Sequence, residues 1–315
     1  MNYTAVIRTL GTAGDKYQQL LDSLNSQSVA PNEVIVYIAE GYPIPKETIG
    51  KERYVYVKKG MVAQRALRYD EVTTEYILFL DDDLIFPPDT VEKMFQLLVE
   101  NKADVISPDI FPNSRRSRKS EILMSVSGRM RARKYDKVWG YKVMRTGGYS
   151  YNKTPQNDVY MSQTNAGACF LCRKDDMVKI HFDDELWLDN MAYALGDDQV
   201  MYYKMYLSGL KILTWYGHQF KHLDAGNNMG PEKEKMRLYG DVYFKTIFWH
   251  RFIYLPEPSA LMKIWSVVCI LYFLLFTILI SVARFRRDIL RTKCKAIVDA
   301  GCFLRSNEYN SLPRI

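Results

Sequence analysis

Three consecutive aspartates, Asp81 to Asp83, follow directly on the apolar run Tyr76–Leu80. Adjacent carboxylates repel one another, so a buried strand that ends in three of them calls for a positively charged partner. Mg²⁺ and Mn²⁺ bind carboxylate oxygens and are commonly held together with substrate phosphates. The cluster therefore predicts a metal–diphosphate site at the carboxyl end of a strand, where α/β sheets bind their ligands. A solvated acidic turn before a helix near Pro87 is the alternative interpretation.

A second acidic pair, Asp197 and Asp198, follows Gly196 at the start of a predicted helix. Carboxylates are stabilised at helix N-termini by the free backbone N–H groups, so a capping role is one interpretation. Asp197 can cap the helix while Asp198 points into a cleft. Two acid clusters after different strands then predict two separate roles: one cluster holds a cation, and the other accepts a proton.

Alternating strands and helices are predicted to position these groups. The strands are Tyr3–Leu10, Glu33–Ala39, Tyr54–Val57, Tyr76–Leu80, Ala103–Ile106, Asn165–Arg173 and Lys211–Tyr216, and the helices are a segment from Asp15 to Leu24, Met61–Val72, Thr90–Glu100 and Asp197–Ser208. This order favours a doubly wound, mostly parallel α/β sheet. The segment Phe111–Gln163 has weak periodicity and is predicted to be a long, partly mobile excursion over the active face.

The composition indicates one large α/β domain plus an appendage, with 315 residues, 48% apolar and 25% charged. The net charge of +7 is concentrated in residues 113–153 and in residues 284–315, where eight Lys and Arg face three acids. Such basic stretches favour anionic partners: phospholipids, a lipid-linked phosphate or a nucleotide. The sequence has no helix-turn-helix, zinc-finger or RNA-binding signature, so nucleic acid is not expected as a partner.

The five cysteines are an odd, scattered set, which argues against a disulfide framework and for a reducing compartment. Cys169 and Cys172 lie in a predicted strand, where residues three apart point to opposite faces, so both are expected in the core. The chain begins directly on a predicted strand, so no signal peptide is expected.

Ile264–Ala283 is a run of twenty uncharged, mostly apolar residues, long enough to cross a bilayer as a helix. The preceding segment, Asp241–Leu255, is aromatic and basic, as is typical of a lipid–water interface. A true span would put the basic tail outside the cell, against the positive-inside rule, so a re-entrant or in-plane helix with both ends cytosolic is an equal alternative. The chain is accordingly divided into a catalytic domain, 1–245, and a membrane-associated part, 246–315.

Several motifs resemble, in order, those of the family 2 glycosyltransferases of the GT-A fold, over about Tyr3 to Tyr254. They are Val6-Ile-Arg-Thr-Leu10, Leu21-Asp-Ser-Leu-Asn-Ser-Gln27, Ala63-Gln-Arg-Ala-Leu67, Leu80-Asp-Asp-Asp83, Asn165-Ala-Gly-Ala168, and Gly196-Asp-Asp198 followed by Tyr206-Leu-Ser-Gly-Leu-Lys211. The resemblance implies an inverting enzyme that uses a nucleotide-sugar donor. The Gln-x-x-Arg-Trp motif of the processive polymer synthases is absent, which favours the addition of one or a few sugars.

The same resemblance implies roles for individual residues. A divalent metal, Mn²⁺ or Mg²⁺, is expected at Asp81, Asp83 and His222, with His222 preferred over His218. Asp198 is expected to be the general base and Asp197 its acidic neighbour. The nucleotide, with a UDP-sugar favoured, is expected to contact Thr9, Glu40, Arg65 and Asp82.

The expected acceptor is a lipid-linked or other glycan in cell-surface polysaccharide biosynthesis, at the cytoplasmic face of the inner membrane. The basic segment Arg115–Lys153 is expected to hold the acceptor's phosphates. Two alternatives remain open: sugar transfer directly onto polyprenyl phosphate, and a non-catalytic nucleotide-sugar-binding scaffold of the same fold. A nucleotidyltransferase could use the metal site but would not need Asp198 as a base.

Overall fold

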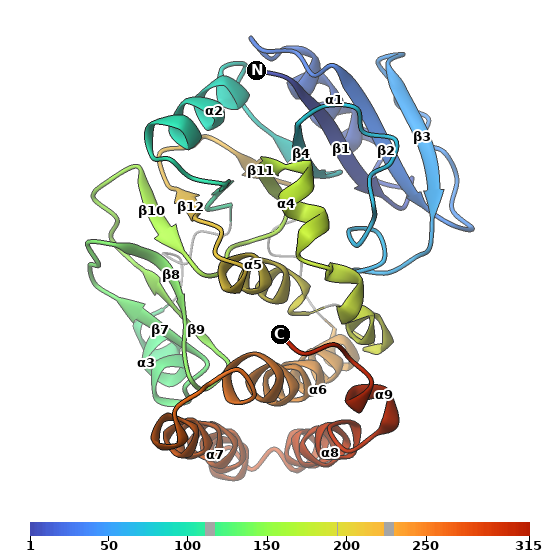
Figure 1. Cartoon of the computed structure of the whole chain (residues 1–315). Helices are drawn as coiled ribbons and strands as arrows, with labels where there is room; N and C mark the ends of the chain where they lie inside the picture. The colour runs from blue at the N-terminus through green and yellow to red at the C-terminus, as the bar shows by residue number, and fades with distance from the viewer. Residues whose placement is uncertain (111–116, 194, 224–229) are drawn as a thin grey trace.

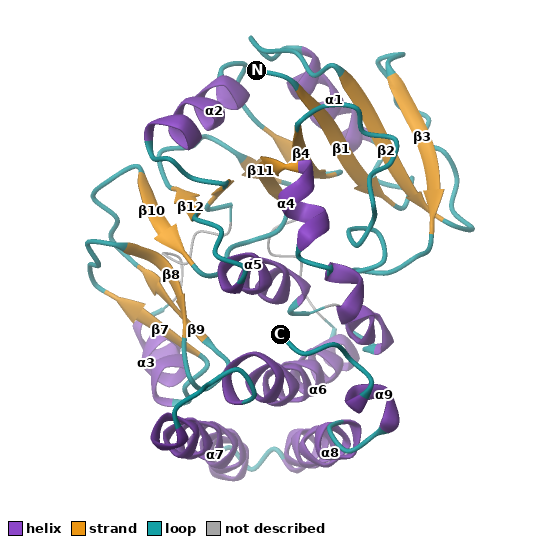
Figure 2. Ribbon diagram, viewed as in Figure 1, coloured by secondary structure: helices purple, strands orange, loops and turns teal. Residues whose placement is uncertain are grey.

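The computed structural model describes residues 1–110, 117–193, 195–223 and 230–315 (Figure 1). Strands predominate in the first half of the chain, with a few helices between them, and helices dominate after position 215 (Figure 2). The predicted α/β class is confirmed.

Eleven of the described strands form one large mixed sheet with the order β3-β2-β1-β4-β11-β6-β12-β10-β8-β9-β7. Parallel pairs such as β1–β2 and β1–β4 make up most of it, whereas β11 runs antiparallel between β4 and β6. The strands are β1 (Tyr3–Thr9), β2 (Glu33–Ala39), β3 (Glu52–Val57), β4 (Tyr76–Asp81), β6 (Val105–Pro108), β7 (Met130–Arg133), β8 (Trp139–Val143), β9 (Tyr149–Asn152), β10 (Val159–Ser162), β11 (Cys169–Arg173) and β12 (Ile212–Trp215).

Two hydrophobic cores lie on opposite faces of this sheet. One face is covered by α1 (Asp15–Asn25) and α2 (Thr90–Glu100), through side chains such as Leu20 and Phe95. The other is covered by α4 (Lys174–Lys179), the 3₁₀ helix η2 (Phe182–Asn190) and α5 (Asp197–Leu207). Cys169 belongs to the first core and Cys172 to the second, which confirms that these cysteines are buried on opposite faces.

The prediction of a helix at Met61–Val72 is wrong, because this segment is a series of turns. Asp189 of η2 accepts hydrogen bonds from the backbone N–H groups of Val62 and Ala63, at 2.9 and 3.0 Å. Tyr69 then adopts a left-handed φ of 54°, which an α-helix cannot contain. The turns are therefore stabilised by a residue more than a hundred positions away in the sequence.

The segment after position 116 is not an irregular excursion. It contains α3 (Arg118–Val126) and the strands β7 to β10, which extend the central sheet through the antiparallel β10–β12 pair. These strands have four or five residues each and several half-buried positions, so they lack a clear alternating pattern. Arg115 of the predicted phosphate-binding segment lies outside the described residues.

The C-terminal part consists of α6 (Pro231–Phe248), the π-helical turn η3 (Trp249–Tyr254), α7 (Ala260–Ala283), α8 (Arg287–Phe303) and α9 (Asn307–Asn310). The aromatic rings of Phe244, Phe248 and Phe252 were expected at a lipid–water interface, but they are buried in the core beside α5. Helix α6 runs through positions 245 and 246, where the chain was divided; the division itself stays a prediction.

A buried ionic network joins η3 to the sheet domain. Glu185, with no exposed surface, accepts hydrogen bonds from Arg251 at 2.8–3.1 Å and from Lys204 at 3.0 Å. Burial alone would raise the pKa of Glu185, but Arg251 and Lys204 hold it below its usual value. The C-terminal helices are thereby attached to the face of the sheet that carries α5.

Candidate active site

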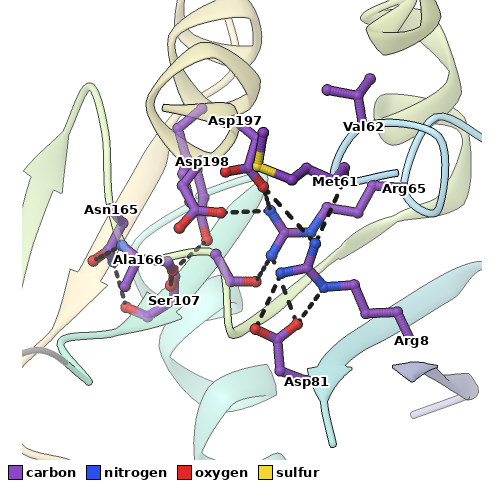
Figure 3. Close-up of polar contacts among 12 residues, drawn as sticks. Arg8, Met61, Val62, Arg65, Asp81, Ser107, Asn165, Ala166, Asp197 and Asp198 are labelled. Atoms are coloured by element: carbon purple, nitrogen blue, oxygen red, sulfur yellow. Dashed lines mark hydrogen bonds and ion pairs between the residues drawn. The ribbon is translucent and has the colours of Figure 1, made fainter. Parts of the chain in front are cut away.

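The carboxyl ends of β1 and β4 bring an arginine against the first aspartate of the acidic run. Arg8 and Asp81 are register partners on these parallel strands. The Arg8 guanidinium donates from Nε to Asp81 Oδ1 at 2.5 Å and from Nη2 to Oδ2 at 3.1 Å (Figure 3). Burial would raise the pKa of Asp81, but Arg8 and Arg65 together lower it. Both oxygens of this carboxylate are therefore occupied by a cation of the protein itself.

Arg65 connects the two acid clusters that the sequence singles out. Its side chain is 1% exposed, and its Nη1 donates to Asp197 at 2.8 Å and to Asp198. Its Nη2 donates to the Gly167 carbonyl at 2.8 Å and lies 3.7 Å from Asp81 Oδ1 (Figure 3). Burial works against the charge, yet the three carboxylates raise the pKa of Arg65 above its usual value. Arg65 is thus engaged by acids, and its contact with a nucleotide stays a prediction.

Asp197 and Asp198 have different environments at the start of α5. Asp197 is the first residue of the helix and makes no capping hydrogen bond, since the N-cap is Gly196 with a φ of 91°. Burial, followed by the charge of Asp198, raises the pKa of Asp197 to about 6. The Asp198 side chain is 34% exposed and lines a cavity of about 640 Å³. Asp198 is therefore the member of the pair that a substrate can reach.

The cavity beside Asp198 is bounded by elements from distant parts of the chain. Asn165, Ala166 and Gln199 lie near Asp198, whereas Arg129 and Lys245 belong to the segment after α3 and to α6. Asn165 Nδ2 donates to the Ser107 carbonyl at 3.1 Å, which ties the segment before β11 to β6 (Figure 3). A cavity of this size can accommodate a small organic ligand.

Replacing Gly167 by alanine is expected to abolish the function of Asp198 without unfolding the protein. A Cβ atom at this position would lie 2.0 Å from Asp198 Oδ1 and 2.8 Å from Arg65 Nη1, so the carboxylate would have to move. The matched control is Gly240→Ala, whose Cβ would meet its nearest described neighbour at 3.8 Å. Activity and melting temperature should be measured together; equal activities of the two variants would contradict the prediction.

Asp82 turns toward β1 rather than toward the arginines. Thr9 Oγ1 donates to Asp82 Oδ2 at 2.5 Å and accepts the backbone N–H of Gly11 at 2.8 Å. Burial, with a further contribution from Asp81 and Asp83, raises the pKa of Asp82 to about 6. The structure thus brings Thr9 and Asp82 together, as two of the four residues expected at the nucleotide.

Asp83 meets His222 through a small second sheet. Strand β5 (Leu84–Ile85) pairs with β13 (Lys221–His222), and His222 Nε2 lies 3.0 Å from Asp83 Oδ1. Two ligands at adjacent corners of an octahedron, with bonds of about 2.1 Å, are about 3 Å apart. Carboxylate oxygen and imidazole nitrogen are also ligands that Mn²⁺ accepts. The pair therefore fits two positions of a cation whose other ligands would come from phosphate and water.

Among the described residues, no group of three or more His, Cys, Asp or Glu side chains is arranged to hold a metal by itself. Asp81 faces Arg8, so a metal role for it stays a prediction. His218 points elsewhere: its Nε2 lies 2.9 Å from the Asp109 carbonyl. Glu40 is exposed at the end of β2, and its side chain has no partner within the part of the chain that the structure describes.

Sequence reasoning missed Arg8 as a site residue. It is the single charged residue in the otherwise apolar or hydroxyl-bearing run Thr4–Thr9 and stands at the carboxyl end of the strand. A charge in that position is a signal that could have identified it. The contribution of α6 to the cavity had no comparable signal, because Arg237 and Lys245 follow β12, the last strand of the large sheet, by more than twenty residues.

Comparison with known proteins finds that part of the chain is similar to one family. The model of glycosyl transferase family 2 matches residues 51–170, a segment that contains Arg65, the three aspartates and Gly167. No curated protein matches the chain. Two structures of S. aureus TarS 1–349 are similar: the complex with UDP-GlcNAc has 12% identity and a TM-score of 0.49 and covers 95% of this chain and 80% of TarS. The second TarS structure has 14% identity and a TM-score of 0.48, and the match covers 87% of this chain and 71% of TarS. The family match spans less than half of the 315-residue chain, so it shows that residues 51–170 are similar to glycosyl transferase family 2.

Proposed function

We propose that the protein transfers a sugar from a nucleotide-sugar donor, a UDP-sugar in the first instance, to a hydroxyl of a lipid-linked saccharide acceptor, with inversion at the anomeric carbon. The pathway proposed is the biosynthesis of a cell-surface polysaccharide. The single observation that carries the proposal is the placement of Asp198. It is the accessible member of an acid pair bound to Arg65, and it lines the cavity of about 640 Å³.

Asp198 is the proposed general base. An acceptor hydroxyl has a very high pKa and needs a carboxylate within hydrogen-bond reach when it attacks the anomeric carbon. Arg65 keeps the carboxylate oriented through its bond to Asp198, and the Gly167 carbonyl fixes Arg65 in turn. The neighbouring Asp197, whose pKa is raised to about 6, shares the same cation. If the acceptor hydroxyl activated by this base attacks the anomeric carbon directly, and no protein side chain does, the reaction is a single displacement with inversion.

Asp83 and His222 are proposed to hold the divalent cation, Mn²⁺ or Mg²⁺, as the 3.0 Å separation of their donor atoms supports. A cation there would offset the negative charge that develops on the departing diphosphate. Thr9 and Asp82 at the end of β1 and β4, with Glu40 at the end of β2, are the proposed contacts of the nucleoside. Arg8, which neutralises Asp81, lowers the charge repulsion that the diphosphate would otherwise meet.

Membrane attachment is proposed to involve α7. Within the described residues it is the one helix long and apolar enough to cross a bilayer, with a mean hydropathy of 2.6. Its buried face carries Ser266, Thr277 and Ser281 besides two apolar residues, whereas Leu271 and Leu275 are 58% and 56% exposed. A helix that turns its apolar side outward is suited to contact with lipid tails.

A re-entrant or in-plane helix is proposed in preference to a span, because the chain after α7 returns to the domain that precedes it. Tyr239 of α6 donates to Asp299 of α8 at 2.6 Å. Arg251 donates to the Pro313 carbonyl at 2.9 Å, close to the end of the chain. A tail on the far side of a membrane could make neither contact.

Protease accessibility in sealed inner-membrane vesicles distinguishes these arrangements. We expect tags placed before Met1 and after Ile315 to be cleaved together in vesicles that expose the cytoplasmic face. Both should be protected in vesicles of the opposite orientation. If the C-terminal tag is cleaved only in vesicles that expose the outer face, the helix is a true span and the re-entrant or in-plane proposal is wrong.

The proposed activity is tested with purified protein, a panel of labelled nucleotide sugars and a lipid extract of the host membrane. We expect one donor to label a lipid-linked glycan in a metal-dependent reaction, with the new linkage of opposite anomeric configuration to the donor. Label on polyprenyl phosphate itself would favour direct transfer onto that lipid. No transfer from any donor, with full activity of a known transferase in the same extract, would favour the scaffold alternative.

A further inference from the structure

A second, smaller cavity of about 170 Å³ adjoins the cavity at Asp198. The two share Met124, Arg129 and Arg237 in their walls. The smaller cavity continues from these residues to the facing sides of α7 and α8, where Thr277, Ser281 and Lys293 line it. The two cavities therefore adjoin at a shared wall that contains two arginines, between the proposed base and the apolar helix.

The smaller cavity carries a surplus of positive charge. Among the described residues that line it are five cations, Arg129, Arg237, Arg284, Arg286 and Lys293, and one acid, Glu234. Asp241, which lines the larger cavity, binds Arg129 at 2.9 Å and also binds Lys245. Burial would raise the pKa of Asp241, but these cations lower it to about 2, and its charge is already balanced by its pairs with Arg129 and Lys245.

Of the other four cations, Arg286 lies 3.6 Å from Asp288, and Arg237, Arg284 and Lys293 have no carboxylate in contact among the described residues. Arg237 Nε is buried without a hydrogen-bond partner, and no ion pair is formed by Arg237, Arg284 or Lys293 within the described residues. The Lys293 side chain is 5% exposed, and its ammonium group donates only to neutral oxygens, Thr277 O at 3.2 Å and Ser281 Oγ at 2.8 Å. Burial, then repulsion from Arg129, lowers the pKa of Lys293 to about 8. Holding cations together in this way costs free energy unless an anion binds between them.

We infer that Arg129, Arg237, Arg284 and Lys293 form a subsite for the phosphate of a lipid-linked acceptor. Several guanidinium groups with an ammonium group suit a phosphate, which offers more acceptor oxygens than a carboxylate. The order of the surfaces matches the order of groups in such a molecule. The sugar would occupy the larger cavity at Asp198 and the phosphate the shared basic wall, and the lipid would pass Ile280 of the smaller cavity to the exposed apolar side of α7. This inference rests on the proposed function, whose acceptor it specifies.

Three probes separate the parts of this ligand: farnesyl phosphate, farnesol and inorganic phosphate, with binding measured to the full chain in detergent. We expect farnesyl phosphate to bind at least tenfold more tightly than either of the others. Arg237→Gln and Lys293→Met should each weaken farnesyl phosphate binding about tenfold to a hundredfold, as expected for the loss of a hydrogen bond to a charged group. The matched control is Arg291→Gln, an exposed arginine of α8 outside both cavities.

Several results would overturn the inference. If farnesol binds as tightly as farnesyl phosphate, the phosphate is not recognised. If inorganic phosphate binds as tightly as farnesyl phosphate, the lipid is not recognised. If short-chain phosphatidylglycerol competes with an affinity equal to that of farnesyl phosphate, the subsite binds bulk membrane headgroups. If Arg237→Gln and Lys293→Met both bind farnesyl phosphate as the wild type does, the phosphate binds elsewhere. Nucleotide binding, measured in the same samples, reports on the donor side independently. A further outcome is that the protein binds farnesyl phosphate in an Arg237-dependent way and yet binds no nucleotide. That result would support the phosphate subsite and contradict the proposed function.

Discussion

Replacing Asp198 by asparagine is expected to lower kcat for sugar transfer about 10²–10⁴-fold, the usual contribution of a general base. Asparagine keeps the shape of the side chain but cannot accept the proton of the acceptor hydroxyl. Arg65 retains Asp197 and Asp81 as partners, so the fold should be preserved. The KM for the donor should also change little, because the proposed nucleotide and metal contacts lie on other residues. The measurement is steady-state kinetics with donor and acceptor varied separately.

Asp175→Asn is the matched control for that variant. Asp175 also lies in the first turn of a helix, α4, and is exposed. It follows Arg173, which pairs with Tyr76 at the opposite end of β4 from Asp81, so it is remote from the site. Full activity of Asp198→Asn would remove the base from the mechanism and favour the scaffold alternative.

Arg65→Met is expected to cause the largest loss of stability. Arg65 is fully buried and is the shared cation of Asp81, Asp197 and Asp198. Removing one partner of a buried ionic cluster leaves uncompensated charges and costs about 3–5 kcal/mol of unfolding free energy. For a domain of this size the melting temperature should fall by roughly 10 °C. Transfer activity should be lost as well, because Asp198 is no longer oriented.

The deficit of Arg65→Met should depend on pH in a defined direction. Burial and Asp198 already raise the folded-state pKa of Asp197 to about 6, above the value of about 3.9 in an unfolded chain. The folded state then binds the proton more tightly, so stability falls as the pH rises through this interval. Arg65 opposes the shift, and without it the interval extends upward. The loss of stability should therefore be greater at pH 8 than at pH 5.

Thermal unfolding of Arg65→Met at the two pH values is compared with that of Arg68→Met. Arg68 is exposed and lies three residues further along the same series of turns. Its replacement should change the unfolding free energy by about 0.5 kcal/mol at most. Two results would contradict this account of Arg65 and the three carboxylates. One is equal destabilisation by the two substitutions; the other is a loss of stability in Arg65→Met, relative to the wild type, that is greater at pH 5 than at pH 8.

The strands and helices at the two acid clusters could be predicted because local patterns determine them. Glu33–Ala39 and Thr90–Glu100 have the predicted boundaries, and the strand predicted at Tyr76–Leu80 is one residue longer and includes Asp81. Their apolar periodicity and flanking polar residues are visible within about ten residues of sequence. The turns at Met61–Val72 were missed because the bonds that stabilise them come from Asp189, in a different element.

The relations between site residues were harder to predict. Asp83 meets His222 through two strands of two residues each, which are too short to have a recognisable pattern. Arg65 was predicted at the nucleotide from its motif alone, whereas its partners are set by the approach of α5 and the segment before β11. The basic cavity combines residues from α6, α7 and α8 with Arg129. The sequence shows that these segments are basic, but it does not show that their side chains line one cavity.

The most direct test of a metal-dependent nucleotide-sugar site is thermal stabilisation of the detergent-purified protein by UDP, GDP, dTDP and CMP, each with and without Mn²⁺. A ligand at about a hundred times its Kd adds about 2.7 kcal/mol to the unfolding free energy, enough to measure as a shift. We predict that one nucleotide, UDP first, stabilises the wild type only with Mn²⁺, and that Asp83→Ala and His222→Ala each abolish this while Glu75→Ala, at the opposite end of β4, does not. The absence of a shift with every nucleotide, or an equal shift in Asp83→Ala, would contradict the site.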